Sequence, residues 1–222
     1  MISTKKLITA SVLSADFTKL GREIEDADKA GADWIHFDIT DGHFVPNLTM
    51  GVNTVVAARK STPLPLDVHL MIENPDNFIT MFADAGADCI SVHMEASRHL
   101  NRSVRKILDL GLKAGVAIGP ATPVDSLKWI IEYLDYVLLL SVNPGFGGQA
   151  FIPNVLDKVR EVSAMIEETE KEILIQADGG INPETIHHFA EAGVNNFVLG
   201  SAIFDSPDYG DTIAQLRRSI AH

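Results

Sequence analysis

Imidazole and carboxylate side chains occur near the ends of three short apolar segments of this chain. His36 and Asp38 lie two residues apart in one segment, Asp67 and His69 in a second, and Asp178 ends a third. Residues two apart in a strand share a face, so each pair can point the same way. The two imidazoles and two of these three carboxylates would form a donor set suited to Zn²⁺, Fe²⁺, Mn²⁺ or Co²⁺. Two carboxylates at one metal also suit reversible proton abstraction next to a carbonyl group.

A hydrogen-bonded structural pair is the plain alternative for each of these segments taken singly. Their joint occurrence at three strand ends is the observation that indicates a metal site. The side chains are far apart along the chain, so they can meet only if the fold brings several strand ends together. A barrel of parallel strands does this, and barrel active sites lie at the carboxyl ends of the strands.

Short apolar runs alternate eight times with amphipathic segments that have a helical pattern. We expect strands at residues 8–13, 34–39, 66–71, 89–94, 114–118, 136–142, 173–178 and 196–200. We expect helices at about residues 18–31, 51–60, 75–85, 100–111, 123–134, 153–168, 183–192 and 207–220.

The helix-to-strand junction also recurs in the sequence. Ala-Gly-Ala-Asp occupies residues 30–33 and 85–88, and the similar Ala-Gly-Val-Asn occupies residues 192–195. Continuous apolar strands joined through helices indicate a parallel sheet, and eight units favour a single (β/α)8 TIM barrel domain over residues 1–222. An open, doubly wound sheet is the structural alternative.

Glycine-bearing loops follow the last three expected strands. They are residues 143–149 (NPGFGGQ), residues 179–182 (GGIN) and Gly200-Ser201. Glycine lets backbone N–H groups approach and wrap an anion, although it can also serve turn formation alone. Phosphate sites in barrels recur around the loops after strands seven and eight. We therefore predict a phosphate site at loops 6–8.

Composition limits the partners and the compartment. The net charge of −12 disfavours nucleic acid and anionic membranes, which need a basic face. The single cysteine, Cys89, excludes an intramolecular disulfide, so we expect a reducing compartment and a buried, inert thiol. No stretch approaches the roughly 18 apolar residues of a membrane span. We expect a cytoplasmic protein that acts on a small molecule.

Several longer motifs are more specific than these pairs and loops. Residues 36–47 (HFDITDGHFVPN), 66–74 (LDVHLMIEN) and 141–153 (SVNPGFGGQAFIP) are the longest. Shorter ones occupy residues 11–17, 120–123, 178–182 and 200–201. In this order, from about residue 7 to residue 205, they resemble the ribulose-phosphate 3-epimerase family.

The resemblance implies roles for particular residues. His36, Asp38, His69 and Asp178 match the family's metal ligands, and Asp38 and Asp178 also match its two acid/base carboxylates. The implied substrate-binding residues are Ser11, His69, Gly145, Phe146, Gly147, Gly148, Asp178, Gly179, Gly180, Gly200 and Ser201. We expect one divalent metal ion per subunit, first Zn²⁺, with Fe²⁺, Mn²⁺ or Co²⁺ as alternatives. The resemblance also suggests a homo-oligomer, either a dimer or a hexamer.

The resemblance further implies a reaction. The family interconverts D-ribulose 5-phosphate and D-xylulose 5-phosphate in the pentose phosphate pathway, by two-base proton transfer at C3 through a metal-stabilised enediolate. D-allulose 6-phosphate 3-epimerase is the nearest alternative, and a non-catalytic sugar-phosphate-binding barrel is another. A Schiff-base aldolase or a decarboxylase is disfavoured, because residues 136–142 and 38–41 carry no lysine.

Some positions depart from the family pattern or leave two interpretations open. Thr40 and Leu140 stand where relatives commonly have methionine, and Gly119 stands where asparagine is common; these changes bear on the rate and the polarity of the pocket. His93 and Glu95, at the end of the fourth expected strand, either support the metal ligands or form a hydrogen-bonded core pair.

Overall fold

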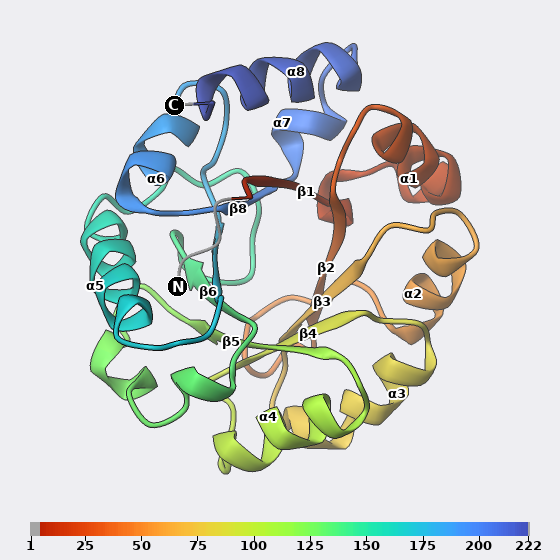
Figure 1. Cartoon of the computed structure of the whole chain (residues 1–222). Coiled ribbons are helices and arrows are strands. Elements are labelled where there is room, and N and C mark those ends of the chain that lie inside the picture. Colours follow the sequence, from red (N-terminus) through yellow and green to blue (C-terminus); the bar gives the residue numbers. More distant parts are fainter. Residues whose placement is uncertain (1–4, 222) are drawn as a thin grey trace.

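Eight parallel strands form a closed barrel in the computed structural model, which describes residues 5–221 (Figure 1). Each strand pairs with the next, and the first closes the ring against the last. The expected TIM barrel is confirmed, and the open sheet is excluded. The strands are Leu7–Ser11 (β1), Trp34–Thr40 (β2), Leu66–Met71 (β3), Cys89–His93 (β4), Lys113–Ile118 (β5), Tyr136–Leu140 (β6), Leu174–Asp178 (β7) and Asn196–Leu199 (β8).

Helices surround the barrel and cover the outer face of its sheet (Figure 1). Because helices cover the outside and side chains fill the inside, the strands read as nearly continuous buried runs. The α-helices are Leu20–Lys29 (α1), Val52–Arg59 (α2), Ile79–Asp84 (α3), Leu100–Asp109 (α4), Val155–Glu167 (α5), Ile186–Ala192 (α6), Ser201–Phe204 (α7) and Tyr209–Ser219 (α8).

The expectation of a helix over residues 123–134 is wrong. This segment forms two short 3₁₀ helices, Val124–Leu127 and Ile131–Tyr133. Its buried side chains include Val124, Leu127 and Ile130, which recur every third residue. A period of three is that of a 3₁₀ helix, whereas an α-helix has 3.6 residues per turn. The first strand is also shorter than expected, since residues 12–14 turn into a 3₁₀ helix.

Aromatic side chains fill the barrel at the amino ends of the strands. Trp34, Cys89 and Tyr136 pack together there with Leu7. Gly115 makes room for the tyrosine, because a Cβ at this position would lie 2.3 Å from the Tyr136 ring. Cys89 is fully buried as expected, and burial raises the pKa of its thiol well above the usual value, which keeps it protonated and inert.

Four side chains at helix-to-strand junctions tie the amino end of the barrel together. Each accepts a hydrogen bond from a backbone N–H of the preceding strand, and we call these four residues the amino-end staples. Two of them end the Ala-Gly-Ala-Asp repeats, and one ends the related segment 192–195. The staples and their donors are Asp33 with Ile8, Asp88 with Leu66, Asp135 with Ala114 and Asn195 with Ile175, each at 2.8 Å.

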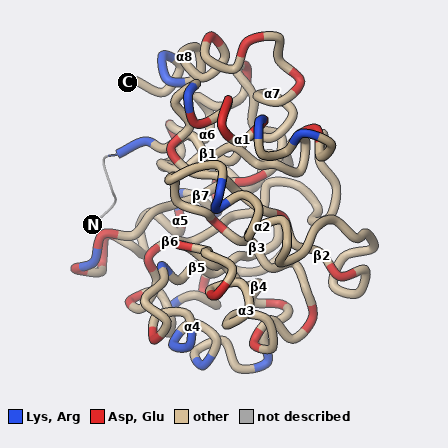
Figure 2. The backbone as a smooth tube through the Cα atoms, turned by 90° about the vertical axis from the view of Figure 1, so that its right-hand side faces the viewer, with Lys and Arg blue, Asp and Glu red and all other residues tan. Residues whose placement is uncertain are grey.

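Charged residues lie mainly on the outer helices and loops, with acidic and basic residues interspersed (Figure 2). This distribution leaves the barrel interior to apolar residues and to a small set of polar ones. None of the helices described within residues 5–221 combines the length and the apolar character needed to cross a membrane.

One amino-end staple offers a matched pair of variants. Asp135→Ala removes the acceptor of the Ala114 N–H, so we expect the free energy of unfolding to fall by about 1–3 kcal/mol. Asp135→Asn keeps an acceptor, as Asn195 does naturally, and should lose only the surface ion pair with Lys171 at 3.2 Å, about 0–1 kcal/mol. Urea unfolding of both variants measures the difference. Equal losses would show that the staple bond contributes nothing.

Candidate active site

Four metal-type side chains meet at the carboxyl ends of three strands. His36 and Asp38 come from β2, His69 from β3 and Asp178 from the end of β7. Parallel register pairs Asp38 with His69 directly across the two strands. One ligand atom from each of the four lies within 4.8 Å of the others. The structure therefore brings together four of the five residues whose spacing first indicated a metal site and leaves Asp67 outside the cluster.

The chemistry and spacing of this cluster fit a divalent ion. Two imidazole nitrogens and two carboxylate oxygens are ligands that zinc and neighbouring transition metals accept. Ligands placed about 2.0–2.2 Å from one ion lie at most about 4.4 Å apart, so small side-chain shifts would complete the coordination. Three of the four side chains are buried, and Asp178 is partly exposed.

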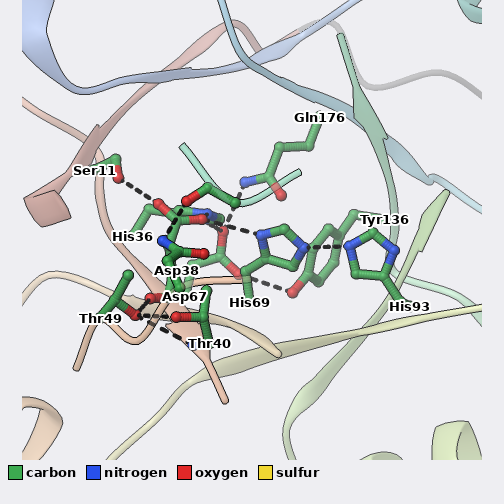
Figure 3. A network of polar contacts seen from close by, with 12 residues as sticks. Ser11, His36, Asp38, Thr40, Thr49, Asp67, His69, His93, Tyr136 and Gln176 are labelled. Atoms are coloured by element: carbon green, nitrogen blue, oxygen red, sulfur yellow. Dashed lines mark hydrogen bonds and ion pairs between the residues drawn. The ribbon is translucent and has the colours of Figure 1, made fainter. Parts of the chain in front are cut away.

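A buried carboxylate orients His36 from the side of its ring that faces away from the cluster. Asp67 Oδ2 lies 2.8 Å from His36 Nδ1, and Figure 3 shows this contact inside the barrel. Tyr136 OH donates to Asp67 at 2.8 Å, and Gln176 Nε2 donates to it at 2.7 Å. Because a carboxylate only accepts, His36 carries its proton on Nδ1 and turns Nε2 toward Asp38, 3.3 Å away. Asp67 thus selects the nitrogen that faces the cluster.

The Asp67 contacts contain functional side chains that sequence reasoning missed. Asp67 was noted beside His69, but no supporting role was assigned to it, and Tyr136 and Gln176 received no role at all. The only sequence signal is that Asp67 and Gln176 are polar residues inside otherwise apolar strands. Their meeting depends on which residues of β3, β6 and β7 face the same level of the barrel interior.

The two aspartates of the cluster have opposite pKa shifts. Burial alone would raise the pKa of Asp38, but charge and hydrogen bonds from His36 and His69 outweigh it and hold the pKa well below its usual range. Burial, followed by the negative charge of Asp38, raises the pKa of Asp178 to about 7. The pair can therefore hold one proton near neutral pH, with Asp38 as the ionised partner.

Ser11 lies beside the ionised aspartate, where the sequence placed a substrate-contacting residue. Its hydroxyl donates to Asp38 Oδ2 at 2.8 Å, as seen in Figure 3. His69 Nδ1 lies 3.1 Å from Asp38 Oδ1, on the other oxygen of the same carboxylate. Both contacts restrict the Asp38 side chain to one orientation.

A cavity opens directly onto the two aspartates. Apolar side chains form part of its wall, and they include Leu13, Met71 and Leu140. The glycine-rich loops form the rest, and the expected residues that line the cavity are Asp38, Asp178, Gly145, Phe146, Gly147, Gly148, Gly179 and Gly180. Gly200 and Ser201 line an adjoining hollow, which shares Gly147, Gly148, Asp178, Gly179 and Gly180 with the first.

Backbone constraints fix the loop after β7. Gly180 has a φ of +65°, and a Cβ there would lie 2.5 Å from the backbone nitrogen of Phe151. Only glycine fits this close approach. The Ser141 hydroxyl donates to the carbonyl groups of Asp178 and Gly179, at 2.9 and 2.5 Å, and so ties this loop to the end of β6. The backbones of loops 6 and 7 therefore pack directly against each other at Gly180.

The three residues that depart from the family pattern lie in different positions relative to the cavity. Leu140 lines it, whereas the Thr40 hydroxyl lies 3.2 Å from that of Thr49 and is absent from the cavity wall among the described residues. Thr40 therefore adds no hydroxyl to this wall. Gly119 donates its backbone N–H to Glu95 at 2.7 Å.

Solved structures share the shape of this barrel. A 3-keto-L-gulonate-6-phosphate decarboxylase from Vibrio cholerae superimposes with a TM-score of 0.75 at 21% identity, covering 98% of each chain. A 3-hexulose-6-phosphate synthase from Salmonella typhimurium has a TM-score of 0.72 at 17% identity, covering 97% of this chain and 98% of its own. At these identities the likeness extends to the fold alone.

Sequence relatives are much more similar. A ribulose-phosphate 3-epimerase from Bacillus subtilis is 52% identical over 213 residues, covering 96% of this chain and 98% of the relative. The Escherichia coli K12 protein of the same name is 47% identical, with 97% and 96% covered. The model of the "Ribulose-phosphate 3 epimerase family" matches residues 7–204. The chain belongs to the ribulose-phosphate 3-epimerase family.

Proposed function

We propose that this chain interconverts D-ribulose 5-phosphate and D-xylulose 5-phosphate by moving a proton at C3, as a metal-dependent enzyme of the pentose phosphate pathway. The observation that carries the proposal is the pair of aspartates, Asp38 and Asp178, which face one cavity from opposite parts of the barrel beside two imidazoles. Relatives that are 47–52% identical over nearly the full chain are named ribulose-phosphate 3-epimerase.

Inverting a carbon centre requires a base on one face and an acid on the other. In one direction the ionised Asp38 carboxylate takes the proton from C3, and the protonated Asp178 delivers its own proton to the opposite face of that carbon. The reverse direction exchanges the two roles. Ser11 holds Asp38 in orientation by donating its hydroxyl proton to Oδ2, so the basic lone pair of Asp38 is directed before substrate enters.

We propose that His36, Asp38, His69 and Asp178 hold one divalent ion, Zn²⁺ in the first instance and Fe²⁺, Mn²⁺ or Co²⁺ otherwise. When bound, the ion would act as a Lewis acid that stabilises the negative charge left when the C3 proton departs. The chain's own contribution is a wall of apolar side chains, Met71 and Leu140 among them, which excludes water and strengthens electrostatic interactions at the reacting carbon.

We assign the phosphate group of the substrate to loops 6–8. Gly147, Gly148 and Gly180 line both the cavity and the adjoining hollow, and Gly200 and Ser201 complete the hollow. Backbone amides without side chains can approach a phosphate closely, which offsets the acidic net charge of the chain locally. Three proposals remain. A single domain rests on the eight repeated units, a homo-oligomer of two or six subunits rests on the family resemblance, and a cytoplasmic location rests on the single cysteine and the lack of a long apolar stretch.

The substrate assignment is tested with purified protein loaded with Zn²⁺. We expect turnover of D-ribulose 5-phosphate, read as D-xylulose 5-phosphate in a coupled assay, to exceed turnover of D-allulose 6-phosphate. The reverse ranking would transfer the assignment to the longer sugar. Phosphate-sugar binding without turnover of either sugar would indicate a non-catalytic binding protein.

The metal site makes a second prediction. Dialysis against a chelator should remove one divalent ion per chain and abolish turnover, and Zn²⁺ or Fe²⁺ should restore both. His69→Ala should bind less than the full equivalent of metal, because one of its four ligands is gone. His188→Ala, which removes an exposed imidazole on α6, serves as the control. Full metal content in His69→Ala, measured by elemental analysis, would contradict the ligand assignment.

The two-carboxylate mechanism makes a third prediction. Asp38→Asn and Asp178→Asn should each lower kcat by about 10²–10⁴, since each removes a group that must carry a proton. Asp157→Asn on α5, where the carboxylate side chain is 76% exposed, should leave kcat unchanged. Metal content should be measured in the same samples, so that loss of the ion is separated from loss of the acid or base. Near-normal turnover in either metal-loaded variant would refute the mechanism.

A further inference from the structure

A second line of polar contacts runs from His69 away from the cluster. His69 Nε2 lies 3.0 Å from Nε2 of His93, and Figure 3 shows the two rings facing each other. His93 Nδ1 in turn lies 3.0 Å from Glu95 Oε2. Both imidazoles are fully buried, and they meet edge to edge, with ring centroids 5.0 Å apart and ring planes 28° from parallel. Asp38, His69, His93 and Glu95 therefore form one continuous line from the cluster to the end of β4.

Glu95 can act only as an acceptor in this line. Its Oε1 accepts from the Gly119 N–H at 2.7 Å and from the Thr122 hydroxyl. Burial alone would raise the pKa of Glu95, but hydrogen bonds from His93, Thr122 and Gly119 outweigh it and lower the pKa to about 2. The carboxylate is therefore ionised at neutral pH and has no proton to give.

Carboxylates stand at both ends of the line, so a cation bound at the Asp38 end leaves the acceptor at Glu95 to decide where the protons of the two imidazoles lie. Because Glu95 only accepts, His93 carries its proton on Nδ1, and the Nε2 of a neutral His93 is then bare. His69 must donate from its own Nε2 to fill that contact, which leaves its Nδ1 bare. This bare nitrogen is the atom that lies 3.1 Å from Asp38 Oδ1.

The unprotonated Nδ1 of His69 is the kind of nitrogen that a divalent ion binds. Asp67 faces Nδ1 of His36, so the nitrogen that His36 turns toward the cluster is Nε2, 3.3 Å from the same oxygen of Asp38. Each histidine of the cluster is thus held from its far side by contacts that end in a carboxylate, Asp67 for His36 and Glu95 for His69.

We propose that Glu95 and His93 are positioning residues that hold His69 in the tautomer whose Nδ1 can bind the metal. The proposal rests on the proposed metal site and deepens it. A purely structural role is the alternative, in which Glu95 and His93 form a hydrogen-bonded pair that contributes to stability and leaves metal affinity unaffected. Partners of this kind typically change metal affinity by about 10–100-fold when they are removed.

An isosteric variant distinguishes the two roles. In Glu95→Gln the Gly119 N–H and the Thr122 hydroxyl still need an acceptor, so the amide oxygen faces them and the NH₂ faces His93. His93 Nδ1 must then accept, which reverses both tautomers and puts a proton on the Nδ1 of His69. Glu95→Ala removes the acceptor without supplying a donor. The tautomer role therefore predicts at least as large a loss in Glu95→Gln as in Glu95→Ala, whereas a packing role predicts the opposite order.

The experiment measures Zn²⁺ and Co²⁺ affinity of the metal-stripped full chain by competition with a chromophoric chelator. We expect both Glu95 variants to bind about 10–100-fold more weakly than wild type, with a changed visible spectrum of bound Co²⁺. The ¹⁵N spectrum of histidine-labelled protein should show the exchanged tautomers in Glu95→Gln. Glu23→Ala is the control, because it removes another buried carboxylate, bonded to Tyr209 and Lys19, from a different part of the fold.

The outcomes separate this inference from the proposed function. Unchanged affinity and an unchanged Co²⁺ spectrum in both Glu95 variants would overturn it, even if their metal-free stability fell. A milder loss in Glu95→Gln than in Glu95→Ala would also overturn it. Wild type that binds no divalent ion would refute the metal site and the inference together. Wild type that binds metal but has no epimerase activity would refute only the proposed reaction, because affinity is measured without substrate.

Discussion

A charge buried inside a closed barrel must find its partners among side chains of other strands, and this requirement organises the molecule. Asp67 is fully buried, and its partners come from β2, β6 and β7. Leaving such a carboxylate without partners would cost several kcal/mol. The same hydrogen bonds that stabilise the Asp67 carboxylate also fix the ring of His36. They join side chains of β6 and β7 to Asp67 of β3 across the barrel interior. Stability and site geometry therefore depend on one set of hydrogen bonds.

Much of the fold could be predicted because the physical signal is local. Each strand is a short apolar run, since both faces of a parallel sheet are buried, and the alternation with helices predicts the closed barrel. The segment over residues 123–134 was predicted wrongly because it is short. Over such a length its buried positions fit the period of an α-helix nearly as well as that of a 3₁₀ helix. The repeated junctions were recognised as boundaries, but the hydrogen bonds of the amino-end staples were not, since these depend on strand neighbours.

The candidate site also contains residues that could be predicted from the sequence and residues that could not. His36, Asp38 and His69 were predicted because each occupies a motif whose spacing puts it on the inner face of a strand end. Asp178 followed from its place at the end of the seventh strand. The Asp67 contacts with Tyr136 and Gln176 were not predicted, because they join three strands at one level of the interior, and register across a barrel leaves no spacing pattern in the chain. The sequence left open whether His93 and Glu95 support the metal ligands or form a separate core pair. The distances show that both residues continue the line of contacts that starts at His69.

The amino-end staples have a consequence for the opposite end of the barrel. They join neighbouring strands at the closed end, and three of them also accept, through their own carbonyl groups, from the first N–H of the next odd-numbered strand. The scaffold is thus held together by side-chain and backbone hydrogen bonds at the end of the barrel opposite the candidate site. Loops at the other end can then vary in sequence while the frame is kept. Solved barrels with TM-scores of 0.72–0.75 share this frame at 15–21% identity, and their names are those of decarboxylases and a synthase.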